Sequence, residues 1–153
     1  MGTKPLTINY ALTDSPVGQL AWIRDKIGVI VDGYEWTPEK VITWAMFYII
    51  AGNIATCSIY REAHLHMKKE IFDAPPIKST VAVGFSSFPE DVGYIPRWWA
   101  QDMVAENISF WREHNKGGHF PSIEVPDVLT NDIRDFLQTV DKGRFEDLKK
   151  AGI

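Results

Sequence analysis

A histidine preceded by two glycines, His119 after Gly117 and Gly118, is the clearest candidate for chemistry in this chain. Glycine allows positive φ and close approach of the backbone to other groups, so we expect His119 to lie at a strand end and not inside a core face. Imidazole titrates near neutral pH, which suits a general base. It also suits a histidine that only caps a strand end, and the spacing leaves both interpretations open.

Two carboxylates, Glu90 and Asp91, follow an earlier predicted strand. In parallel α/β sheets, ligands bind beyond the carboxyl ends of the strands, so these acids and His119 are expected at one edge. A carboxylate that accepts the Nδ1 proton of a histidine fixes its tautomer and leaves Nε2 to take a proton from water or a nucleophile. The alternative is that both acids are solvated loop residues beside the turn-forming Pro89.

The first half of the chain has a helical pattern. Ser15-Pro16 and Thr37-Pro38 each combine a capping side chain with a proline suited to the first helical position. The apolar spacing after Pro38 continues to Ala63 and predicts a long helical segment with a break near Gly52-Asn53. Residues 73–79 contain two adjacent prolines and predict a loop that separates the two halves.

The second half alternates strand and helix signals. Strands are expected at 80–85 and 108–111, with helices starting at Pro96 and spanning about 125–140. This order predicts a parallel α/β arrangement, although two strands are too few for an independent doubly wound sheet. We therefore predict a helical part over residues 1–74 and an α/β part over residues 75–153.

Composition narrows the class of protein. A chain of 153 residues is long enough for a folded core, and its net charge of −4 gives no reason to expect nucleic acid as a partner. The longest apolar stretch, Trp44 to Ala51, is too short to span a bilayer, and the single Cys57 suggests a buried, inert thiol. We expect a cytoplasmic protein with no cofactor and no bound metal ion.

Four segments resemble, in the same order, motifs of the epoxide hydrolases of the α/β-hydrolase fold, in the branch of the microsomal-type and soluble fungal enzymes. They are Ala11–Ile23 (ALTDSPVGQLAWI), Ile59–Glu62 (IYRE), Gly84–Asp91 (GFSSFPED) and Gly117–Pro126 (GGHFPSIEVP). The resemblance implies the C-terminal part of that fold. Residues 1–74 would be the remainder of a helical cap, and residues 75–153 the last two parallel strands with their flanking helices.

In that family an aspartate attacks the epoxide to form an ester, and a water activated by histidine hydrolyses the ester. The resemblance gives His119 the role of the water-activating base and Asp91 that of its orienting acid. Asp91 is preferred to Glu90 because it stands second after Pro89, where the family places its acid. Tyr60 matches one of the two tyrosines that donate hydrogen bonds to the epoxide oxygen, and the implied substrate is a small apolar epoxide.

Two parts of the family pattern do not occur in this sequence, namely the HGxP segment and the nucleophilic aspartate at a strand-to-helix elbow. Asp14, Asp25 and Asp32 lie in or beside the helices expected in the first half, so none replaces the nucleophile. We therefore expect the isolated polypeptide not to turn over epoxides. Uncovered strand edges also predict marginal stability, self-association or association with a complementary fragment.

Two other functions remain open. The chain could be a non-catalytic module in which the cap-like helices and a tryptophan-rich surface bind a partner or sequester an apolar molecule. The chain could also derive from a haloalkane dehalogenase, which shares the aspartate nucleophile and histidine base. Tyr60 in its motif favours epoxide opening over dehalogenation.

Overall fold

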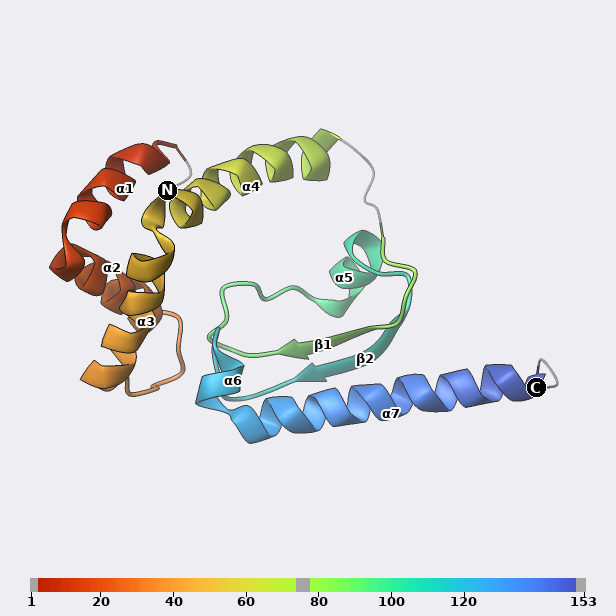
Figure 1. Cartoon of the computed structure of the whole chain (residues 1–153). Coiled ribbons are helices and arrows are strands. Elements are labelled where there is room, and N and C mark those ends of the chain that lie inside the picture. Colours follow the sequence, from red (N-terminus) through yellow and green to blue (C-terminus); the bar gives the residue numbers. More distant parts are fainter. Residues whose placement is uncertain (1–2, 74–77, 151–153) are drawn as a thin grey trace. The chain divides into compact units, whose positions relative to one another are not determined.

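The chain forms two compact units (Figure 1). A computed structural model describes residues 3–73 and 78–150. The first unit contains Met1–Val29 and Glu35–Pro75, and the second contains Ile30–Tyr34 and Pro76–Ile153. Part of the predicted 73–79 loop lies outside the described residues, and the assignment of residues 1–74 to a cap stays a prediction.

The first unit is helical, as predicted. Its helices are α1 (Pro5–Asp14), α2 (Pro16–Gly28), α3 (Pro38–Ala51) and α4 (Asn53–Asp73). The Ser15 hydroxyl accepts a hydrogen bond from the Gly18 amide at 2.9 Å, and Thr37 caps α3 in the same way. Both predicted helix starts are therefore confirmed, whereas α1 is a helix that the sequence analysis did not identify separately.

The helices of the first unit enclose an apolar core. Helix α1 packs against α4, and α2 packs against α3. The buried apolar side chains are Leu12, Ile23, Ile27, Trp36, Val41, Ala45 and Cys57. The Trp36 indole donates to the Ile27 carbonyl at 3.1 Å and meets Trp44 edge to face at 5.1 Å. Cys57 is 4% exposed, which confirms the expected buried thiol, and burial raises the pKa of that thiol.

Helices α3 and α4 are separated by a single residue, Gly52, whose φ of 82° ends α3 at the predicted break. Segments Pro38–Ala51 and Thr56–His66 are bent by 81° relative to each other. Among the described residues, no single helix is long and apolar enough to cross a membrane. This bent pair meets the requirements of length and composition only when its two segments are taken together.

The second unit is built on two parallel strands, β1 (Val83–Ser87) and β2 (Ile108–Glu113), as predicted. Its helices are α5 (Arg97–Met103), α6 (Pro121–Glu124) and α7 (Pro126–Lys150). Strand β1 starts and ends later than the predicted 80–85. The reason is pairing with β2, because Ser86 and Ser87 are in register with Arg112 and Glu113.

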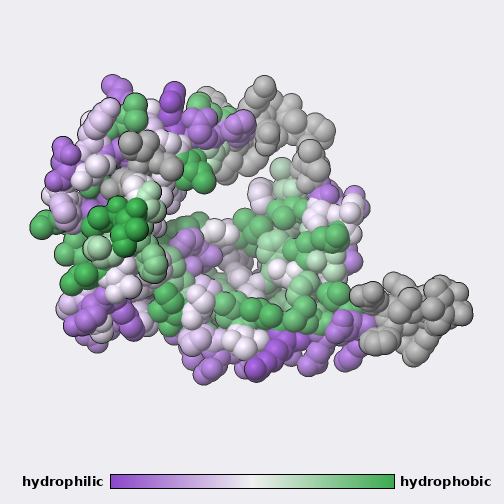
Figure 2. Space-filling model, in the orientation of Figure 1, coloured by the Kyte–Doolittle hydropathy of each residue, from purple (hydrophilic) through white to green (hydrophobic). Residues whose placement is uncertain are grey.

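Helix α7 covers one face of the strand pair. The Phe136 ring packs directly on the backbone of Gly84, where an added Cβ would lie 2.9 Å from the ring, and it also meets the Phe110 ring. Figure 2 shows hydrophilic side chains along the outer side of α7 and hydrophobic ones along the side facing the strands. Phe85 of β1 and Trp111 of β2 pack against a small buried cluster of Ala100, Ala105 and Ile108, the last of which begins β2.

A buried carboxylate joins α7 to the ends of both strands. Asp132 is 2% exposed and accepts hydrogen bonds from Ser86 Oγ at 2.7 Å, Arg112 Nη1 at 2.6 Å and His114 Nε2 at 2.6 Å. The second Arg112 nitrogen donates to the more exposed Asp135 at 2.9 Å. Burial alone would raise the pKa of Asp132, but its three donors outweigh burial and lower that pKa.

We predict that Asp132→Asn lowers the free energy of unfolding by about 2–3 kcal/mol, because a buried set of donors loses its charged acceptor. Urea denaturation followed by circular dichroism measures the change. Asp135→Asn is the matched control, since its carboxylate contacts the same Arg112 at the surface and should cost less than about 1 kcal/mol. Equal decreases in the free energy of unfolding of the two variants would contradict a larger stabilising contribution from Asp132.

The lowered pKa of Asp132 also predicts a pH dependence. Its contribution to stability is present above its ordinary pKa of 3.8 and is lost as pH falls through the lower folded-state value. The difference in unfolding free energy between the wild type and Asp132→Asn should therefore shrink as pH is lowered from about 5 to 3. A difference that stays constant over this range would contradict the prediction.

Candidate active site

The pairing of the two strands continues beyond their ends into the following loops. The His114 amide donates to the Ser87 carbonyl at 2.9 Å, and the Glu90 amide donates to the Gly117 carbonyl at 3.2 Å. Glu90 and Gly118 then form an isolated parallel bridge. The residues that follow this bridge on the two loops, Asp91 and His119, are therefore placed side by side.

Asp91 and His119 form a hydrogen-bonded pair. Asp91 Oδ1 lies 2.7 Å from His119 Nδ1, and the two side chains are 35% and 41% exposed. An ionised carboxylate only accepts, so Nδ1 carries the proton and Nε2 of the neutral ring is left as an acceptor. Nε2 has no hydrogen-bond partner among the residues that the structure describes. The neighbouring Glu90 uses its backbone, not its carboxylate, to join the two loops.

The two glycines before His119 serve the two purposes expected of them. Gly117 has a φ of 97°, and an added Cβ would lie 2.9 Å from both the Phe88 ring and Val125. Gly118 permits close approach, because a Cβ there would lie only 2.6 Å from the Ile30 carbonyl oxygen. Larger residues at either position would displace the loop that carries His119.

A short segment from early in the chain, Ile30–Tyr34, belongs to the second unit, and we call it the strap. The Ile30 carbonyl accepts the amide proton of His119 at 2.9 Å, and Asp32 Oδ2 accepts that of Gly117 at 2.8 Å. Asp32, which the sequence placed only in or beside helices of the first half, thus supports the histidine loop. The contact joins residues 85 positions apart, so no local pattern predicts it.

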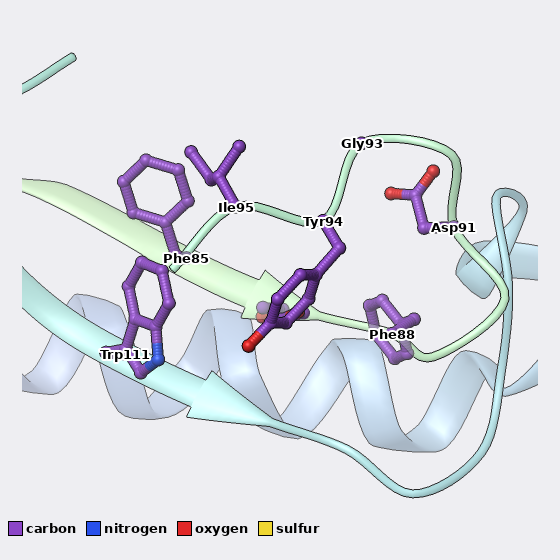
Figure 3. A pocket seen from close by; sticks show the side chains of 9 residues that line it. Phe85, Phe88, Asp91, Gly93, Tyr94, Ile95 and Trp111 are labelled. Carbon is purple, nitrogen blue, oxygen red and sulfur yellow. The ribbon is translucent and has the colours of Figure 1, made fainter. Parts of the chain in front are cut away.

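A hollow of about 140 Å³ adjoins Asp91 on the side of the strands away from Phe136. Figure 3 shows Phe85, Ile95 and Trp111 gathered at one end of it and the Asp91 carboxylate at the other. The Tyr94 ring lies between them. An acid of the candidate pair therefore borders a small, partly aromatic space.

The third predicted site residue, Tyr60, lies on α4 of the first unit with its side chain 56% exposed. Its role as a hydrogen-bond donor to an epoxide stays a prediction, and so do the catalytic roles of Asp91 and His119. In the described part of the chain, no group of three or more His, Cys, Asp and Glu side chains is placed to hold a metal ion.

Two parallel strands, each followed by a loop that carries one member of an Asp–His pair, define part of an α/β-hydrolase fold. Solved structures support this class. The Aspergillus niger epoxide hydrolase matches with a TM-score of 0.71 and 32% identity, over 91% of this chain and 34% of its own. The juvenile hormone epoxide hydrolase of the silkworm Bombyx mori, 23% identical with a TM-score of 0.74, shares the fold.

Sequence relatives specify the class further, since the chain is similar to epoxide hydrolases. Epoxide hydrolase 1 of the pig, Sus scrofa, is 31% identical over 146 residues, which are 88% of this chain and 32% of that protein. A putative epoxide hydrolase of Stigmatella aurantiaca is also 31% identical, over 87% of this chain. No family model matches the chain. The chain spans about a third of the length of these relatives.

Proposed function

We propose that this chain supplies the water-activating half of an epoxide hydrolase site, with His119 as the base and Asp91 as its orienting acid. The observation that supports this most directly is the 2.7 Å contact between Asp91 Oδ1 and His119 Nδ1. The similarity to epoxide hydrolases indicates the reaction in which such a pair would take part. The implied substrate is a small apolar epoxide, and the product is a vicinal diol.

The chemistry of the pair follows from its hydrogen bonding. His119 Nε2 takes a proton from water, and the resulting hydroxide adds to the carbonyl carbon of an ester between the substrate and a carboxylate nucleophile. The ester C–O bond then breaks, and the proton on Nε2 passes to the diol alkoxide. Asp91 stabilises the imidazolium that exists between these two transfers. General base catalysis of this kind contributes roughly 10²–10⁴-fold to the rate.

The nucleophile for the first step must come from outside the described strands. Strand β1 leads into the loop that carries Asp91, and that carboxylate is already paired with His119. The proposed contribution of Tyr60 is a neutral O–H donated to the epoxide oxygen as negative charge develops there. This function requires a nucleophile and further strands from outside these 153 residues, either in the same protein or in a complementary polypeptide. The cytoplasmic location expected from the sequence stays a prediction.

We predict that the 153-residue polypeptide alone leaves a chromogenic epoxide unchanged, because a base without an ester to hydrolyse performs no turnover. Turnover should appear after co-expression with the part of the Aspergillus niger enzyme that this chain does not match. His119→Ala should then reduce the rate by at least about 10²-fold. Glu90→Gln, beside Asp91 but outside the pair, is the matched control and should retain the rate.

Co-elution of the two polypeptides must be checked for each variant. This check distinguishes a variant that has lost activity from one that no longer forms the complex. Histidine-dependent turnover by the chain alone would contradict the expected inactivity. Turnover by the complex that survives His119→Ala would contradict the role of the base. A stable complex without any turnover would contradict the proposed function as a whole.

A second candidate, binding of a small apolar molecule, is favoured by a hollow of about 360 Å³ in the first unit. Residues of α2 and α3 line it together with the buried Trp36, and its wall includes Leu20, Val41 and Ile42. This volume lies within the usual range for small-molecule sites. The hollow is separate in the chain from Asp91 and His119, so it supports a function that needs neither residue.

If the hollow binds apolar molecules, the neutral fluorophore N-phenyl-1-naphthylamine should bind with a dissociation constant raised about tenfold by Ile42→Gln. Ile50→Gln is the matched control, because Ile50 is an exposed isoleucine on the same helix that does not line the hollow. Fluorescence titration measures both constants. Equal affinities in the two variants would exclude the hollow as the binding site.

A further inference from the structure

We propose that Glu124 and the strap are positioning residues for His119, and that Glu124 holds the strap and the histidine loop together. This inference rests on the proposed role of His119 as a base. In the sequence, Glu124 belongs to the Gly117–Pro126 motif, but the motif assigns it no role. Asp32 was rejected as the nucleophile and has no other role in the resemblance. The structure connects both residues to the backbone on either side of His119.

Three amides around the histidine donate to the strap or to Glu124. The Gly117 amide donates to Asp32 Oδ2 at 2.8 Å, and the His119 amide to the Ile30 carbonyl at 2.9 Å. The Phe120 amide donates to Glu124 Oε1 at 2.9 Å. A loop with two adjacent glycines has high conformational entropy, and these bonds restrict it at the residues next to the ring.

Glu124 uses its two carboxylate oxygens for two different segments. Oε1 accepts from Phe120, and Oε2 accepts from the Asp32 amide of the strap at 2.8 Å. Only a carboxylate offers two acceptor oxygens here, because glutamine would present an NH₂ group to one of the two amide donors. The carboxylate of Asp32 differs, since a single oxygen of it accepts from Gly117 and asparagine can replace that oxygen.

The backbone of the strap lies so close to Gly118 that no side chain fits between them. A Cβ on Gly118 would lie 2.6 Å from the Ile30 oxygen, 2.9 Å from Val31 Cα and 3.0 Å from Glu124 Oε2. The strap and Glu124 thus contact the loop from Gly117, two residues before the histidine, to Phe120, the residue after it. Base catalysis needs Nε2 within hydrogen-bond reach of the attacking water, so fixing this backbone fixes where the proton is taken.

The test follows the ring tautomer of His119 by ¹⁵N NMR in the full 153-residue chain. The wild type should show the Nδ1–H form imposed by Asp91, whereas the neutral ring of a histidine side chain free in water favours Nε2–H. Glu124→Gln and Asp32→Ala should lose this preference. Asp32→Asn should retain it, because an acceptor oxygen remains for Gly117. Amide hydrogen exchange at Gly117, His119 and Phe120 should accelerate about tenfold or more in the two damaging variants.

The outcomes separate this inference from the function on which it rests. A wild-type ring in the Nε2–H form would overturn both, because the Asp91–His119 pair would be absent in solution. An Nδ1–H ring that is unchanged in Glu124→Gln and Asp32→Ala would overturn the positioning role and leave the proposed function intact. Glu90→Gln is the matched control for loss of a nearby charge. If Glu124→Gln fails to fold, the comparison of Asp32→Ala with Asp32→Asn still tests the positioning role, because Asp32 is exposed.

Discussion

The second unit depends on one buried carboxylate. Asp132, on α7, accepts hydrogen bonds from Ser86 on β1, Arg112 on β2 and His114 just beyond β2. A buried carboxylate is costly unless its oxygens are satisfied, and here the donors come from β1, from β2 and from the residue that follows β2. The helix and both strand ends are thereby fixed together where the loops that carry Asp91 and His119 begin.

From that fixed point, parallel pairing determines the candidate site. The loops after β1 and β2 remain in contact through Glu90 and Gly118, so the next residue on each loop faces the other. This explains why Asp91 and not Glu90 meets the histidine. The strap adds a support that comes from a distant part of the sequence, and Glu124 joins that support to the loop.

In chemical terms, the arrangement supplies only part of what the proposed function requires. A histidine whose Nδ1 is paired with a carboxylate can activate water, but hydrolysis needs an ester and therefore a nucleophile. Strand β1 has one strand neighbour within the described residues, although parallel strands are usually buried among several. Both observations agree with similarity to only about a third of an epoxide hydrolase.

The sequence by itself determined features that depend on local chemistry. Ser15 and Thr37 predicted helix starts because a capping side chain and the following proline act within one turn, and two glycines predicted an unusual loop before His119. Only the tertiary structure decided the end of β1, the burial of Asp132, and the place of Asp32 and Glu124 beside His119. These depend on hydrogen bonds between residues far apart in the chain, and their geometry exists only after the chain has folded.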